Sequence, residues 1–187
     1  MANHAADLLE RFRSGDREAF QTLVCEMGPR LKGFFLRQGA QAATAEDLTQ
    51  DVFLRIYNSK TTYQATGRLD AYFFRIARNI WIDSRRKKRP VLLGDDQPDA
   101  IDSAPSPVEQ VDLADRAAQL RQWVAELDPE AHELVELAVL QQLPYREISE
   151  ILGIPVGTVK SRVFYTLRRL REQASAIDPN TPSEGSP

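Results

Sequence analysis

The stretch from Leu143 to Glu172 reads LPYREISEILGIPVGTVKSRVFYTLRRLRE and predicts two helices joined by a tight turn. Apolar residues at helical spacing mark the first helix, and Gly153 supplies the backbone freedom that a sharp helix end requires. Pro155 can begin the second helix, because a residue in the first turn needs no hydrogen bond from its own backbone nitrogen. The second helix carries an apolar stripe formed by Val156, Val159, Val163, Leu167 and Leu170.

The outer face of this second helix is basic. From Lys160 to Arg171 the chain has five bases and no acid. A helix with one buried apolar stripe and a basic outer face fits the major groove of DNA, so the pattern predicts a DNA-binding helix-turn-helix. The alternative is a helix whose basic face is only solvated, but turn, stripe and basic face coincide within a single short stretch. The residues away from the stripe are Lys160, Ser161, Arg162, Phe164, Tyr165 and Arg168.

The composition favours a soluble globular protein. The chain has 187 residues, of which 42% are hydrophobic and 27% charged, enough for one medium or two small domains. We expect a cytoplasmic location, because no apolar run has membrane-spanning length and no signal peptide is evident. The single cysteine, Cys25, lies in an apolar helical pattern and is predicted to be a buried, reduced thiol.

The residues that carry most enzyme chemistry are sparse. The only histidines are His4 and His132, which with one cysteine disfavours a structural zinc site. The sequence has no glycine-rich loop to hold phosphates and no credible pairing of a nucleophile with a base. It therefore predicts no catalytic residues, no metal and no cofactor.

Charge is strongly segregated along the chain. The net charge is −3, yet Arg68–Arg89 carries eight bases and two acids, whereas Val91–Asp115 carries seven acids and no base. The distribution predicts two basic surfaces separated by an acidic segment.

Helical periodicity recurs through most of the chain, and no strand-like alternation appears. Gly28–Pro29 is expected to kink or split the second helix. Asp16 is predicted to cap that helix, Thr44 with Asp47 to form a capping box at the next, and Asp128 to cap the helix that Pro129 opens. The predicted helices are Ala5–Arg13, one beginning after Asp16 and including Phe20 to Phe35, Thr44–Asn58, Leu69–Lys88, Val108–Glu126 and Pro129–Gln142, followed by the helix-turn-helix.

The segment between the two halves separates two domains. Residues 90–107 hold four prolines, many acids and few apolar residues, so they bury too little to order themselves. We therefore predict an all-α protein of two small helical domains joined by a flexible acidic linker. The predicted bounds are 1–90 for the N-terminal domain, 91–108 for the linker, 109–174 for the C-terminal domain and 175–187 for a disordered tail.

Two segments of the N-terminal half carry more than fold information. Glu46–Tyr57 is amphipathic, with a mostly acidic outer face. Tyr72–Arg89 interleaves aromatic and arginine side chains and ends in five consecutive bases. Bases at a helix C-terminus complement its dipole, but five exceed that need, and aromatic residues beside arginine suit single-stranded nucleic acid.

Taken in order, these segments resemble the extracytoplasmic function (ECF) sigma factors, small two-domain bacterial sigma factors. The resemblance spans residues 5–172 and rests on Gly15-Asp16-x-x-Ala19-Phe20, Glu46–Tyr57, Phe74–Asp83 with the following arginines, and Leu143–Arg171. It implies that the chain binds core RNA polymerase through the β′ and β subunits, directs it to specific promoters and helps to melt them. It further implies an anti-sigma factor as a partner.

The resemblance also assigns roles to residues of the N-terminal half. The residues implied to dock on the clamp helices of the β′ subunit are Asp47, Gln50, Asp51 and Phe53. The loop from Thr61 to Arg68, with Thr61, Thr62 and Tyr63, is implied to capture a flipped base of the minus-ten element. The residues implied to read that element from the following helix are Arg75, Arg78, Asn79, Asp83, Arg85 and Arg86. Asp83 is a carboxylate that can accept from cytosine but also repels phosphate.

In the C-terminal half the resemblance places the minus-thirty-five element against the second helix of the helix-turn-helix. The implied contact residues are Thr158, Lys160, Ser161, Arg162, Phe164, Tyr165 and Arg168. Tyr165 departs from the family, which often has a base there, and Ser149 stands where alanine is commoner.

Two other functions remain open from the sequence. One is a helix-turn-helix regulator that acts without core polymerase, which would need neither Glu46–Tyr57 nor the basic helix. The other is a polymerase-binding adaptor without promoter activity. The inducing signal, the promoter sequence and the set of regulated genes are not encoded in any recognisable motif.

Overall fold

A computed structural model describes residues 2–58, 68–88, 119–120 and 122–177. Every element in this part of the chain is a helix, as predicted. The chain divides into two units, one formed mainly by the N-terminal half and one by the C-terminal half. None of the described helices is both long and apolar enough to cross a membrane.

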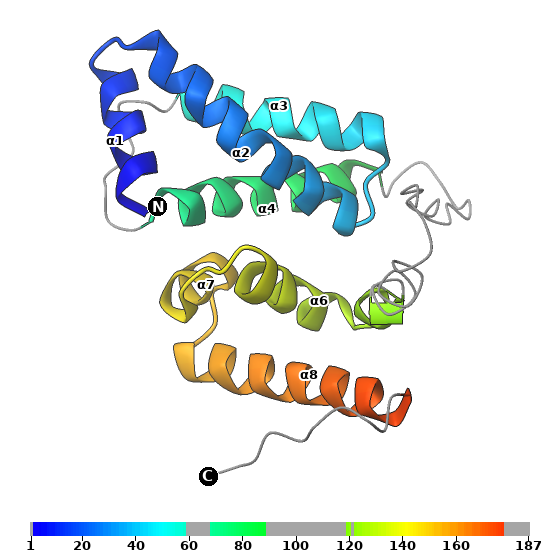
Figure 1. Ribbon diagram of the computed structural model, residues 1–187. Helices are drawn as coiled ribbons and strands as arrows, with labels where there is room; N and C mark the ends of the chain where they lie inside the picture. The colour runs from blue at the N-terminus through cyan, green and yellow to red at the C-terminus, as the bar shows by residue number, and fades with distance from the viewer. Residues whose placement is uncertain (1, 59–67, 89–118, 121, 178–187) are drawn as a thin grey trace, which may run out of the picture. The chain divides into compact units, whose positions relative to one another are not determined.

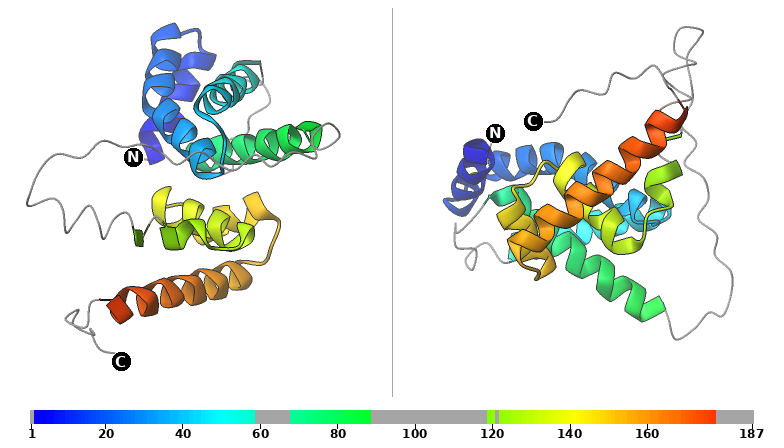
Figure 2. Two further views of the ribbon diagram at one scale, coloured as in Figure 1. Left: turned by 90° about the vertical axis from the view of Figure 1, so that its right-hand side faces the viewer. Right: turned by 90° about the horizontal axis from the view of Figure 1, so that it is seen from below.

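The described part of the N-terminal unit contains four helices: α1 (Ala2–Arg13), α2 (Arg17–Arg37), α3 (Ala42–Asn58) and α4 (Leu69–Lys88). Helix α2 packs against α1, α3 and α4, and α3 also packs against α4 (Figures 1 and 2). The core is rich in aromatic residues, among them Phe34, Phe35, Phe73 and Phe74. Rings from different helices meet edge to face, as where Phe34 of α2 lies 5.7 Å from Phe74 of α4.

Asp16 caps α2, as the sequence predicted. Its Oδ1 accepts hydrogen bonds from the backbone N–H groups of Glu18 and Ala19, at 3.0 and 3.1 Å. Arg11 at the end of α1 donates to Oδ2 from Nε and Nη2, at 3.0 and 2.7 Å. The bond from Ala19 and those from Arg11 hold the pKa of the Asp16 carboxyl below its ordinary value of 3.8. The capping carboxylate thus also ties α1 to α2.

This lowered pKa makes the contribution of Asp16 to stability depend on pH. The contribution is present above the pKa of the unfolded chain and is lost as the pH falls through the lower pKa of the folded chain. We expect Asp16→Asn, which keeps a capping side chain, to unfold at lower urea concentration than wild type at pH 7, with the difference shrinking toward pH 3. Asp47→Asn, which removes an exposed carboxylate that caps nothing, is the control. A wild-type-to-Asp16→Asn difference of equal size at both pH values would contradict this role.

Two predictions about α2 and α3 are wrong, and of the two outcomes predicted for Pro29 the split does not occur. Helix α2 is continuous through Pro29, whose missing hydrogen bond falls beside exposed Cys25, where water can reach the carbonyl left unpaired. Cys25 is exposed rather than buried, because it lies off the stripe that includes Leu23 and Met27. Helix α3 begins at Ala42, so Thr44 lies inside its first turn and is not the cap.

The C-terminal unit contains α6 (Pro129–Val135), η1 (Glu136–Leu140), α7 (Tyr145–Leu152) and α8 (Val156–Ile177). Helix α6 packs against α8 (Figure 1). One part of the core joins Leu127, Val135 and Leu170, with Trp123 and Leu167 packed against them. Helix α8 ends at Ile177, three residues beyond the predicted end of this domain.

The helix that starts at Pro129 is not regular as far as Gln142. Asp128 caps it as predicted, because its Oδ1 accepts from the backbone N–H of Ala131 at 2.9 Å. From Glu136 the backbone widens into a π-helix, in which the N–H of Gln141 donates to the carbonyl of Glu136. The side chain of Gln141 also donates to the buried Glu136 carboxylate at 2.8 Å. This second bond supports the wider turn, which periodicity alone does not reveal.

Candidate protein-binding and nucleic-acid interfaces

The outward face of α3 carries the predicted docking residues together with apolar side chains. Asp47, Gln50, Asp51 and Leu54 are spaced i, i+3, i+4 and i+7, so they form one strip along the helix. All four are exposed. Phe53 is only 8% exposed, so of the predicted docking residues it alone lies mainly in the core.

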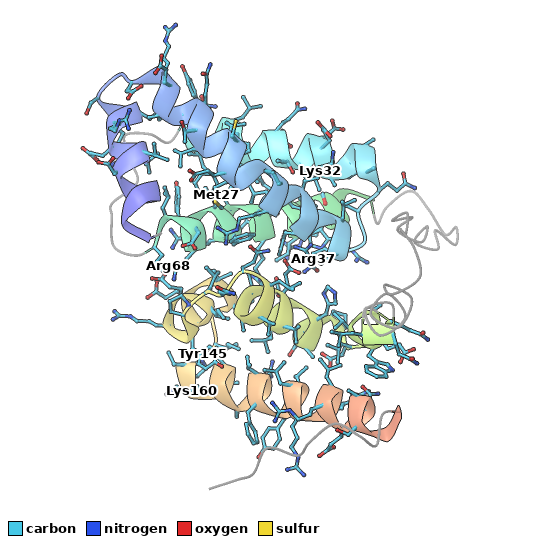
Figure 3. The ribbon with its side chains drawn as sticks, viewed as in Figure 1. Met27, Lys32, Arg37, Arg68, Tyr145 and Lys160 are labelled. Atoms are coloured by element: carbon cyan, nitrogen blue, oxygen red, sulfur yellow. The ribbon has the colours of Figure 1, made fainter. Side chains whose placement is uncertain are left out.

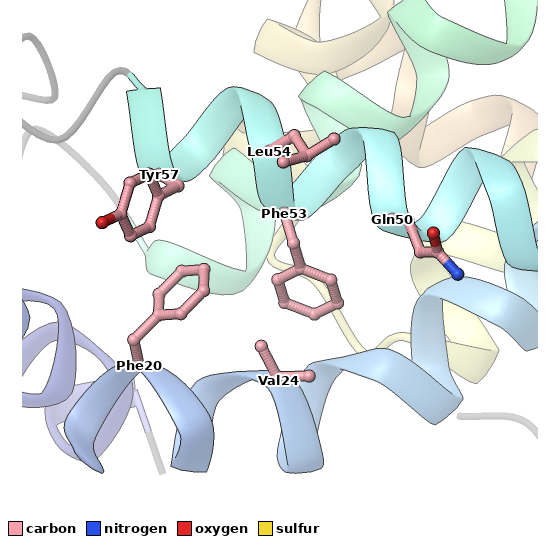
Figure 4. A pocket seen from close by; sticks show the side chains of 6 residues that line it. All are labelled: Phe20, Val24, Gln50, Phe53, Leu54 and Tyr57. Carbon is pink, nitrogen blue, oxygen red and sulfur yellow. The ribbon is translucent and has the colours of Figure 1, made fainter. Parts of the chain in front are cut away.

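An open apolar groove continues this strip between α2 and α3. Its volume is about 330 Å³. Leu54 is 57% exposed, and Tyr57 and Val24 are exposed as well. Figure 4 shows side chains from both helices converging on the groove. The ring of Phe53 points from α3 toward Phe20 and Val24 of α2. The residues that line it are Phe20, Val24, Gln50, Phe53, Leu54 and Tyr57.

Aromatic contacts hold this groove in shape. The ring of Phe20 lies 6.2 Å from Phe53 and 5.5 Å from Tyr57, both edge to face. Phe12 of α1 packs behind them, at 4.6 Å from Phe20 and 5.3 Å from Tyr57. A rigid apolar groove beside two exposed carboxylates is a surface suited to a protein partner with apolar and basic side chains. The acidic part of this surface was predicted from the sequence and its apolar part was not, although Leu54 and Tyr57 lie off the buried stripe of α3 and were the available signal.

Helix α4 presents the predicted polar and basic residues on its surface. Arg75, Asn79 and Asp83 follow at intervals of four residues, so they share one side of the helix. Arg75 lies over the ring of Tyr72 at 5.4 Å, and Arg85 over the ring of Trp81 at 5.7 Å. The residues of this set that are exposed are Arg75, Asn79, Asp83, Arg85 and Arg86, while Arg78 is half-buried.

The start of α4 is anchored by a buried carboxylate. Asp70 accepts two hydrogen bonds from Arg68, at 3.1 and 2.7 Å, and Arg30 of α2 approaches to 3.9 Å. Figure 3 labels Arg68 at the first turn of the helix. The predicted base-capturing residues Thr61, Thr62 and Tyr63 lie outside the described residues.

The turn between α7 and α8 has the predicted form. Gly153 ends α7 in the left-handed region with φ +69°, and its N–H donates to the carbonyl of Ser149 at 2.9 Å. The Ser149 hydroxyl donates to the carbonyl of Ile154 at 2.6 Å, so this side chain also closes the turn. Pro155 lies immediately before α8, and its carbonyl accepts the N–H of Val159 at 3.0 Å.

The apolar stripe of α8 is turned inward and its basic face outward. Val159, Val163 and Leu170 are buried. Phe164 and Tyr165 are 61% and 64% exposed, and their rings meet edge to face at 5.5 Å. The predicted contact residues Lys160 (Figure 3), Ser161, Arg162, Phe164, Tyr165 and Arg168 are all exposed, and Thr158 is half-buried.

Two bases of this face are held by carboxylates. Nε of Arg168 donates to Glu172 one turn later at 2.8 Å, and this hydrogen bond raises the pKa of the guanidinium. Nη1 of Arg162 donates to Oε2 of Glu130 in the first turn of α6. Glu130 was not singled out from the sequence, since it lies 32 residues away in the chain.

No cluster of histidine, cysteine and acidic residues that could hold a metal occurs within the described ranges. What these ranges present are exposed surfaces for macromolecules: one polar and apolar on α3, and basic ones on α4 and α8. Such surfaces suit binding to a protein and to nucleic acid.

Comparison with known proteins places both halves of the chain. Residues 23–91 match the family model for Sigma-70 region 2, and residues 117–170 that for Sigma-70 region 4. The ECF RNA polymerase sigma factor RpoE of Cereibacter sphaeroides is 31% identical over 165 residues, covering 86% of this chain and 88% of that protein. The RNA polymerase sigma factor CarQ of Myxococcus xanthus is 30% identical over 170 residues, covering 91% and 97%.

A solved structure has the same fold. The sigma factor RpoE of Bartonella quintana, determined in complex with the anti-sigma factor NepR, aligns with a TM-score of 0.63 and 24% identity over 82% of this chain and 94% of that one. The fold, the two region matches and the identity with relatives along nearly the whole chain agree. The chain belongs to the extracytoplasmic function family of RNA polymerase sigma factors.

Proposed function

We propose that this sigma factor docks on core RNA polymerase through the exposed strip of α3 and the adjoining groove, and reads promoters through α4 and α8. The observation that carries the proposal is the apolar groove beside Asp47, Gln50 and Asp51. A regulator that binds duplex DNA without polymerase has no use for this second surface. The basic outer face of α8 alone would fit either function.

The division of labour follows from the chemistry of each surface. Arg162 and its neighbours on α8 meet the minus-thirty-five element as a duplex, because a helix with a basic face fits the major groove. Asn79 and the arginines of α4 meet the minus-ten element after its bases unstack, because aromatic and arginine side chains suit exposed bases. The mechanism is differential binding that favours the open strand, and it involves no covalent step.

We also propose bounds for the domains that carry out these two roles. We assign residues 1–90 to polymerase binding and melting, 91–108 to an acidic linker, and the residues from 109 to the end of α8 at Ile177 to duplex reading. The family-model matches at 23–91 and 117–170 fall within or close to the two assigned domains. We also propose a cytoplasmic location and control by an anti-sigma factor, a partner with which the Bartonella relative was solved.

Reconstituted transcription tests the proposed function. The chain is mixed with bacterial core polymerase and a library of genomic DNA, and the transcripts are sequenced. We expect transcripts that start downstream of one shared two-part sequence and that are absent with core polymerase alone. Binding to core polymerase without such transcripts would indicate the adaptor. Tight, sequence-specific binding of the isolated chain to promoter duplex would indicate a conventional regulator.

A further inference from the structure

We propose that Glu130 is a positioning residue for promoter recognition, which holds the guanidinium of Arg162 in the orientation that reads a base edge. The inference rests on the proposed contact of α8 with the minus-thirty-five element. It adds a residue from another helix, α6, to the determinants of sequence specificity.

The contact joins two helices that belong to one unit. Asp128 caps α6 and thereby fixes the backbone of the first turn, where Glu130 lies. Helix α6 packs against α8, and the Glu130 carboxylate accepts from Nη1 of Arg162. Among the described residues, Arg162 is the base of α8 that is paired with a carboxylate of another helix, since Arg168 pairs within α8.

The pair contributes little to folding. The side chains of Arg162 and Glu130 are 45% and 74% exposed, and ion pairs at this level of exposure are screened by water and salt. Its effect falls instead on the conformations of Arg162. An unpaired arginine on a helix surface samples many rotamers, and a carboxylate fixed at the base of a packed helix restricts them.

The N–H donors that Arg162 keeps free of Glu130 are the ones needed to recognise a base. Arginine has five N–H donors, and the contact with Glu130 occupies one of those on Nη1. Nε and Nη2 stay available for a bidentate contact with O6 and N7 of guanine. A guanidinium held on one side presents the other as a rigid fork, so less rotamer freedom is lost on binding DNA.

The charge of Glu130 also acts on DNA of any sequence. A carboxylate beside the recognition helix repels phosphate, and this repulsion weakens binding to the correct and incorrect promoter alike. Glu130 therefore lowers the affinity of the protein for DNA of any sequence and raises its discrimination between base pairs. Removing it should change these two quantities in opposite directions, which a purely structural residue would not do.

The test uses holoenzyme assembled from core polymerase and the full chain. A minus-thirty-five element is first selected from random duplex by wild-type holoenzyme, and each of its guanines is then replaced in turn. We expect Glu130→Ala to lower discrimination at one guanine about threefold to tenfold, part of the roughly 5- to 150-fold that a bidentate contact provides. Affinity for duplex lacking the element should rise. Glu126→Ala, which removes an exposed carboxylate that pairs with Gln122, should leave discrimination unchanged.

A double-mutant cycle separates failure of this inference from failure of the proposed function. With Arg162→Ala, discrimination at the same guanine should be lost and Glu130→Ala should add nothing. Unchanged or improved discrimination in Glu130→Ala, while Arg162→Ala loses it, would overturn the positioning role alone. Full discrimination in Arg162→Ala would instead refute the proposed reading by Arg162, and the inference with it.

Discussion

A Leu54→Arg chain is expected to bind core RNA polymerase about 30- to 1,000-fold more weakly than wild type. Leu54 is the last residue of the exposed strip of α3, at the point where the strip meets the groove, and it lines that groove. The few hot-spot residues of a protein interface each contribute about 2–4 kcal/mol, which corresponds to this range in Kd if Leu54 is one of them. An arginine there also places an unpaired charge in an interface that excludes water.

The groove explains why the effect should concentrate at this residue. Phe20, Phe53 and Tyr57 are already packed against one another, so a partner that covers them orders few additional side chains. Leu54 is the apolar lining residue with the largest exposed fraction, so it has much apolar surface left to bury. Binding is measured by titrating labelled chain with core polymerase.

Two further variants separate apolar contact from charge. Asp51→Arg reverses a charge on the same strip and should weaken binding more at low salt than at high salt, because exposed charges are screened. Gln41→Arg adds the same charge at an exposed position just before α3 and should bind normally. If Leu54→Arg, with unchanged helicity and melting temperature, binds core polymerase as wild type does, the groove is not the docking surface.

The features that the sequence predicted well are those encoded by neighbouring residues. Helix α4 has its predicted bounds, because its apolar stripe is regular. The helix-turn-helix was predicted for the same reason: Gly153 is required where φ is +69°, and the stripe of α8 fixes which face is buried. Once the buried stripes of α4 and α8 are assigned, the basic outer faces of both helices follow.

The features that were missed depend on residues far apart in the sequence. The groove exists only because α2 brings Phe20 and Val24 beside Leu54 and Tyr57 of α3. Each residue alone is an ordinary apolar position of an amphipathic helix. The contact between Glu130 and Arg162 likewise depends on how α6 packs against α8, and no local spacing specifies it.

Other errors arose where packing overrides local propensity. Proline at position 29 should break a helix, yet buried residues on both sides of it, Met27 and Leu31, hold α2 continuous. A regular helix through Gln142 was expected, but the buried Glu136 and Gln141 bond to each other across a wider turn. Helix propensities give the intrinsic free-energy cost of a proline or a widened turn in a helix. They do not include the tertiary contacts that offset this cost.

Asn79→Ala and Arg162→Ala are expected to fail at different steps of initiation. Arg162 lies on the outer face of α8, and its loss should cost on the order of 1–3 kcal/mol if it reads a base bidentately. That loss falls on the closed complex, in which the promoter is still duplex. Asn79 lies on the exposed side of α4 with Arg75 one turn before it, and its expected target is an unstacked base.

A promoter with a pre-melted bubble over the minus-ten element distinguishes the two. Opening the duplex costs a few kcal/mol of stacking and pairing, and the protein recovers this by binding the released bases. When the bubble is supplied in advance, the protein no longer has to provide that free energy. Transcription by the Asn79→Ala holoenzyme should therefore recover far more than transcription by the Arg162→Ala holoenzyme, whose defect precedes melting.

Matched controls keep the comparison specific. Asn58→Ala removes an exposed asparagine at the end of α3, and Arg171→Ala removes an exposed arginine of α8. Arg171 follows Arg162 by nine residues, roughly 14 Å along α8, so it lies too far along the helix to reach the base that Arg162 is expected to read. Both controls should initiate on duplex and bubble promoters as wild type does. If the bubble restores Asn79→Ala and Arg162→Ala equally, or restores neither, the two helices do not divide melting and duplex reading between them, because a defect in either step would then have the same dependence on the state of the DNA.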